Sequence, residues 1–213
     1  MFYIKIRKKI LILILLTSHQ FGYSQNKNDF KLSLFNKFPL QRIELPNNLF
    51  IDKIIPSKKY KYMEFVYHSE GTYRGKTIAY KGDSIKYSNK ISAIQSFSGF
   101  FNNCFPVICN YYIIAINEND SIELIDNEEK FKAFIGSIDN NEEIKLIVKL
   151  NKYWFDKKKK RGAIREIDDS FYLYLAYEER CTIYSIKAIL KKTGEFILVD
   201  KKVNKKTKPC ITH

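Results

Sequence analysis

The chain is poor in the residues from which catalytic and metal centres are most often built. Its 213 residues include three histidines, four cysteines and one tryptophan. Beyond the first 24 residues only His68 and His213 remain, and His213 is the last residue. Glycine (8) and proline (5) are also scarce, which excludes collagen-like and linker-rich architectures.

The spacings that metal sites require are missing as well. Zinc sites need paired CxxC knuckles or histidines near cysteines, and neither pattern occurs. The acidic residues between 118 and 143 lack the EF-hand spacing, and turns and helix N-termini account for most of them. Paired carboxylates for glycoside hydrolysis stay open, because acids are too common to decide it. The sequence predicts no metal site and no cofactor.

His68 is the one internal histidine available for general base chemistry in the chain after residue 24. It precedes Ser69 and Glu70, an order that invites a hydrolase interpretation. Nothing in the sequence resembles a nucleophile elbow, and a catalytic triad is defined by three-dimensional roles. We therefore predict no catalytic residue and favour a protein that is not an enzyme. A small envelope hydrolase using His68 is kept as an alternative.

The N-terminus has the three-part plan of a secretory signal peptide. Four basic residues lie between positions 5 and 9, an unbroken apolar run spans 10–16, and a more polar stretch follows. The run is too short to cross a bilayer, which takes about 20 residues. We expect cleavage between Ser24 and Gln25 and a periplasmic or extracellular protein without a transmembrane segment. An uncleaved anchor or a buried N-terminal strand is the alternative.

The chain is strongly basic even without this leader. The formal net charge of +14 becomes about +10, because residues 1–24 carry four basic and no acidic residues. Outside the cytoplasm a basic surface favours anionic glycans and lipids rather than nucleic acid. The partners we expect are an anionic envelope glycan or lipid, or another envelope protein, with no nucleic acid.

All four cysteines lie in the exported part of the chain. An even number of cysteines in an oxidising compartment predicts disulfides, and four cysteines allow three pairings. We favour Cys104–Cys109 and Cys181–Cys210. Four residues separate Cys104 from Cys109, whereas two residues separate the cysteines of a thioredoxin-like redox centre.

Strand patterns occupy much of the chain. Residues 62–69 are aromatic and β-branched, and 76–88 alternate around a glycine at position 82, which predicts a hairpin. Residues 111–125 predict a second hairpin with its turn at 118–120. Residues 25–60 are predicted to be a less regular N-terminal extension.

Two helices are predicted in the middle of the chain. Asp126 and Glu129 have capping-box spacing, and Asp139 and Glu142 repeat it. Apolar residues follow at helical spacing in both segments: Phe131, Phe134, Ile135 and Ile138, then Ile144, Ile147, Val148 and Leu150.

Further strands follow the helices. The patterns lie at 162–168, 170–179, 182–190 and 195–203, with a hairpin at 192–194 that brings Cys181 opposite the region before Cys210. Strands, helices and strands joined by hairpins predict an α+β fold with antiparallel β-hairpins or sheet and two consecutive central helices. We expect one disulfide-stapled domain spanning 25–213.

Part of the chain resembles small exported proteins of unknown function in the Bacteroidota. The motifs that carry the resemblance lie within about 109–210: Phe134-Ile135-Gly136, Ile138-Asp139, Glu142-Glu143, Tyr153-Trp154, Leu173-Tyr174-Leu175 and Cys181. The chain departs from these proteins at Lys152, where they have glycine. The resemblance implies export and a common fold, and it carries no activity across.

A basic run beside aromatic residues is the best surface candidate. The candidate anion- or glycan-binding patch consists of Tyr153, Trp154, Lys157, Lys158, Lys159, Lys160 and Arg161. The competing interpretation is a solvated loop after a helix, with Trp154 in the core. These observations favour a non-catalytic binding or interaction module of the cell envelope or secreted space. An inhibitor or immunity-type protein against an envelope enzyme is the other alternative.

Overall fold

The computed structural model describes residues 27–39, 53–69, 75–101 and 109–206. Contacts between Cα atoms divide the chain into residues 1–33 and 34–213, and each unit is described by itself. The predicted signal peptide, Cys104, Cys210 and His213 lie outside the described residues. In the first unit the described residues form short 3-10 turns, η1 (Lys27–Phe30) and the start of η2 (Leu32–Leu34).

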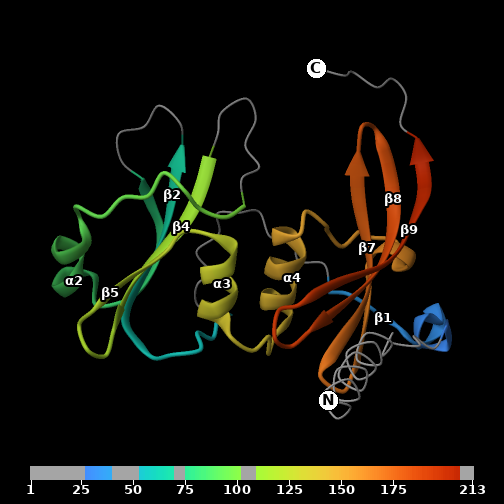
Figure 1. The fold of residues 1–213 in the computed structure, drawn as a ribbon, viewed down its shortest axis with the longest axis horizontal. Coiled ribbons are helices and arrows are strands. Elements are labelled where there is room, and N and C mark those ends of the chain that lie inside the picture. Colours follow the sequence, from blue (N-terminus) through green and yellow to red (C-terminus); the bar gives the residue numbers. More distant parts are fainter. Residues whose placement is uncertain (1–26, 40–52, 70–74, 102–108, 207–213) are drawn as a thin grey trace, which may run out of the picture. The chain divides into compact units, whose positions relative to one another are not determined.

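The second unit contains a four-stranded antiparallel sheet in the order β3-β2-β4-β5 (Figure 1). Its strands are β2 (Tyr60–Ser69), β3 (Lys76–Gly82), β4 (Cys109–Asn117) and β5 (Ile122–Ile125). Strand β4 is buried along almost its whole length, because apolar clusters cover both of its faces. Its continuous apolar run, without polar alternation, is typical of such a strand.

Helix α2 (Ser84–Ile91) follows β3 directly and corrects the hairpin predicted for residues 76–88. The carboxylate of Asp83 accepts a hydrogen bond from the backbone of Lys86 (3.0 Å) and caps the helix. Tyr87 and Ile91 lie four residues apart and pack against the sheet, while Ile85 is exposed. The sequence alternates over 84–88, which imitates a strand and conceals this helical spacing.

The two central helices are confirmed as α3 (Glu128–Ile135) and α4 (Asn141–Leu150). Their predicted caps are wrong by one residue. Asn127 caps α3 by accepting from Lys130 N (2.9 Å), and Asn140 caps α4 by accepting from Glu142 N and Glu143 N (both 3.0 Å). The apolar faces predicted for both helices are buried.

A five-stranded antiparallel sheet has the order β1-β6-β7-β8-β9. Its strands are β1 (Asn36–Lys37), β6 (Ala163–Ile167), β7 (Ser170–Glu179), β8 (Thr182–Lys191) and β9 (Phe196–Lys206). The predicted turn at 192–194 joins β8 to β9, and Gly194 adopts φ = +86° there. One core cluster contains residues of both sheets and of α3 and α4.

The predicted α+β fold class is wrong, because it underestimates the share of β-structure relative to helix. The described residues form nine strands in two antiparallel sheets and three α-helices, so the fold is more β-rich than α+β. None of these helices is long and apolar enough to cross a membrane.

The description of the fold as disulfide-stapled is also corrected, because no disulfide joins two described residues. Cys109 begins β4 and Cys181 lies in the turn between β7 and β8, and they are not bonded to each other. Neither is a free thiol. The residues predicted to pair with them, Cys104 and Cys210, lie outside the described part of the chain.

Candidate functional site

The predicted basic patch falls on a short, well-braced turn, residues 156–162, which we call the lysine loop. The guanidinium of Arg161 is buried and forms an ion pair with Asp156. The backbone N–H of Asp156 donates to Arg161 O (2.8 Å), which closes the turn. At Gly162 a Cβ would lie 1.8 Å from Asp156 O, so this close approach requires glycine.

The four lysines of the loop, Lys157 to Lys160, are all exposed. Asp156, the acidic residue of the loop, is neutralised by Arg161. None of the four lysine side chains has an ion-pair partner within the described part of the chain. The loop therefore presents four uncompensated positive charges on a turn whose backbone is held in place.

The two aromatic residues of the predicted patch point in opposite directions. Trp154 pairs with Ala176 of β7 through two backbone hydrogen bonds (3.1 and 2.8 Å) and is 40% exposed. The ring of Tyr153 stacks on Phe196 (5.1 Å between centroids) and contacts Tyr177. Because successive residues of an extended segment alternate between faces, Tyr153 and Trp154 do not form one platform. Trp154 and the lysines remain as the exposed part of the patch, whereas Arg161 braces it from inside.

His68 lies at the end of β2, and no described residue around it is a catalytic partner. The side chain is buried, its ring meets Phe97 edge-on (5.2 Å), and its Nε2 has no hydrogen-bond partner among the described residues. A general base must be within hydrogen-bond reach of the proton it takes, directly or through water. Ser69 follows His68 on the strand and therefore points to the opposite face.

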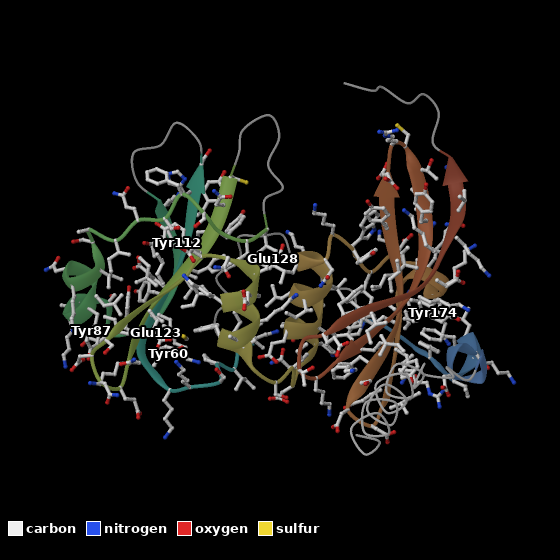
Figure 2. All side chains as sticks on the ribbon, viewed as in Figure 1. Tyr60, Tyr87, Tyr112, Glu123, Glu128 and Tyr174 are labelled. Atoms are coloured by element: carbon white, nitrogen blue, oxygen red, sulfur yellow. The ribbon has the colours of Figure 1, made fainter. Side chains whose placement is uncertain are left out.

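Most acidic residues of the region 118–143 have structural partners, and Glu123 and Asp126 are the clearest cases. Glu123 of β5 accepts hydrogen bonds from Tyr60, Asn117 and Lys58, and Figure 2 shows Glu123 and Tyr60 side by side. Burial raises the pKa of Glu123, but these hydrogen bonds outweigh it and hold the pKa below its ordinary value. Asp126 is paired in the same way with Lys130 (2.7 Å).

The structure also contains one fully buried and one half-buried carboxylate to which the sequence analysis assigned no role. Glu143, fully buried, accepts backbone hydrogen bonds from Ile55 and Asp139 (both 2.8 Å). Glu64, in the middle of β2, accepts from Tyr62 and Thr77. A charged residue at an inward position of an apolar strand is the signal that could have identified Glu64.

Comparisons with known proteins add no assignment. The chain matches no protein-family model, no curated protein and no solved structure. No group of three or more His, Cys, Asp and Glu side chains suited to a metal occurs among the residues described.

Proposed function

We propose that the chain is a non-catalytic binding module that is exported and attaches to anionic surfaces of the cell envelope or secreted space. The observation that carries the proposal is the lysine loop. Its four exposed lysines form no ion pair with any described residue. A flexible basic tail loses conformational entropy on binding, whereas this backbone is already fixed by the Asp156–Arg161 pair.

The expected chemistry is attraction between the lysines and closely spaced phosphate or carboxylate groups. Each lysine near an anionic lipid surface contributes about 1 kcal/mol, so four contribute about 4 kcal/mol, or roughly a thousandfold in affinity. Trp154, exposed beside the loop, adds an aromatic surface of the kind found at polar–apolar interfaces.

The test changes the four loop lysines to serine and measures binding to vesicles containing phosphatidylglycerol. The matched control changes four other exposed lysines that carry the same total charge and are scattered over the segment before β2, the two ends of β3, and β9: Lys59, Lys76, Lys81 and Lys205. Binding to neutral phosphatidylcholine vesicles measures any contribution of the apolar run at 10–16. Binding to an acidic polysaccharide, compared with binding to the anionic vesicles, shows whether the loop prefers glycan or lipid. The loop variant should lose most of its binding, and equal losses in both variants would refute a localised site.

A further inference from the structure

The face of the β3-β2-β4-β5 sheet that α2 packs against has a carboxylate near its centre. Alternation along β2 places Tyr62, Glu64 and Val66 on this α2 face. In the strand register Glu64 lies between Tyr80 of β3 and Ile114 of β4. Its neighbours are therefore mostly apolar or aromatic, and burial raises the pKa of Glu64 above its ordinary value.

Glu64 differs from three other partly buried acids because it has no cationic partner among the described residues. Glu123, Asp126 and Asp156 are each paired with a lysine or arginine. Glu64 accepts from the Tyr62 hydroxyl (3.0 Å) and from Thr77, and no described lysine, arginine or histidine lies within ion-pair distance. A carboxylate has room for about four hydrogen bonds, so two acceptor positions remain.

Aromatic residues surround this carboxylate. The ring of Tyr62 lies 6.4 Å from that of Tyr80 and 5.9 Å from that of Tyr87 on α2. Tyr80 is 55% exposed, so the approach to Glu64 from the β3 side is lined by an accessible ring. Tyr112, which Figure 2 labels on β4, is on the same face, and its hydroxyl is close to Gly75, where a Cβ would lie 2.7 Å from the oxygen.

We propose that Glu64 and the tyrosines around it form a binding site for a primary ammonium group. The ammonium donates up to three hydrogen bonds, to the free positions of the Glu64 carboxylate and to the Tyr62 oxygen, whose own proton is directed at Glu64. The face of the Tyr80 ring adds a cation–π contact. Free amines, amino sugars and lysine side chains share this chemistry.

The test is a titration of the full chain with n-butylammonium chloride, followed by ¹H–¹⁵N NMR, with tetramethylammonium chloride as the comparison. We expect saturable shifts confined to residues of β2, β3, β4 and α2. Glu64→Gln should weaken binding about tenfold or more, the range of a lost charge-assisted hydrogen bond. The matched control Glu178→Gln, an exposed acid on β7, should bind as the unchanged chain does.

A second variant keeps the test decisive if Glu64→Gln fails to fold. Tyr80 is exposed, so Tyr80→Ala should leave the fold intact and still weaken butylammonium binding severalfold. The proposal is overturned if butylammonium causes no saturable shifts, or if Glu64→Gln folds and binds equally well. Equal affinity for tetramethylammonium would also overturn it, since that ion donates no hydrogen bonds.

Discussion

Replacing Glu143 by glutamine is expected to destabilise the fold more than any other loss of one charge among the described acids. Both carboxylate oxygens accept backbone hydrogen bonds, from Ile55 N and from Asp139 N, and the side chain is fully buried. These bonds join the segment before β2 to the start of α4. A second bond to the same helix start, from the Asn140 side chain to Lys53 O (2.9 Å), supports the connection.

The magnitude follows from the chemistry of the amide. Glutamine offers one acceptor oxygen and an NH₂ group, so either Ile55 N or Asp139 N would face a donor instead of an acceptor. Losing one hydrogen bond to a charged group costs about 1.5–3 kcal/mol, and the buried N–H left unpaired keeps the loss at the upper end of that range. We expect the free energy of unfolding of Glu143→Gln to fall by about 2–3 kcal/mol.

The matched control is Glu142→Gln in the same helical turn, which makes the same change in charge. Glu142 forms surface pairs with Lys53 (3.4 Å) and Lys145 (3.6 Å), which contribute at most about 1 kcal/mol. Urea unfolding followed by circular dichroism measures both variants, and hydrogen exchange at the Ile55 amide reports the bond directly. If the two variants lose the same stability and Ile55 stays protected, the reasoning about Glu143 is refuted.

Three further predictions concern the same fold. Asn140→Ala should lower the free energy of unfolding by about 1 kcal/mol through the lost N-cap, measured by urea unfolding, and an unchanged midpoint would contradict it. Lys152→Gly should raise stability by up to about 1 kcal/mol, because Lys152 has φ = +67°, and a lower thermal midpoint would argue against this. Burial raises the folded pKa of Glu64, so its contribution to stability is complete below the unfolded pKa and is lost as the pH rises through the folded pKa. Glu64→Gln should therefore gain stability relative to the parent chain as the pH rises above the ordinary pKa of a glutamate, and stability–pH curves that stay parallel for the two proteins would refute a raised pKa for Glu64.

Helices and strands were predicted best where the spacing of the apolar residues matches the set of residues that is buried in the structure. Residues Phe131, Phe134 and Ile135 recur at helical spacing and are buried in α3, and β7 spans the predicted residues. Helix α2 was missed because its first five residues, 84–88, alternate in polarity, so that Tyr87 and Ile91 alone mark the buried face. The caps were displaced by one residue because asparagine and aspartate are adjacent at both helix starts and either can cap.

Other features depend on contacts that no local pattern encodes. The turn at Arg180 and Cys181 joins β7 to β8 with positive φ at both residues, although glycine or asparagine usually occupies such turns. The pairing of Glu179 with Thr182 leaves these two residues to make the whole turn, which imposes this conformation. The patch was predicted as one surface because its residues are contiguous, yet strand alternation separates Tyr153 from Trp154 and the ion pair with Asp156 buries Arg161. The ligand chemistry of Glu64 likewise arises from β2, β3, β4 and α2 together.

The salt dependence of binding to phosphatidylglycerol vesicles tests the central claim most directly. Affinity of the parent chain should fall steeply as salt rises toward physiological ionic strength, where the screening length is about 8 Å. The variant with serine at the four lysine-loop positions should bind weakly and with little further salt dependence, while the scattered-lysine control keeps the slope of the parent chain. A loop variant that retains both the affinity and the slope would contradict the account.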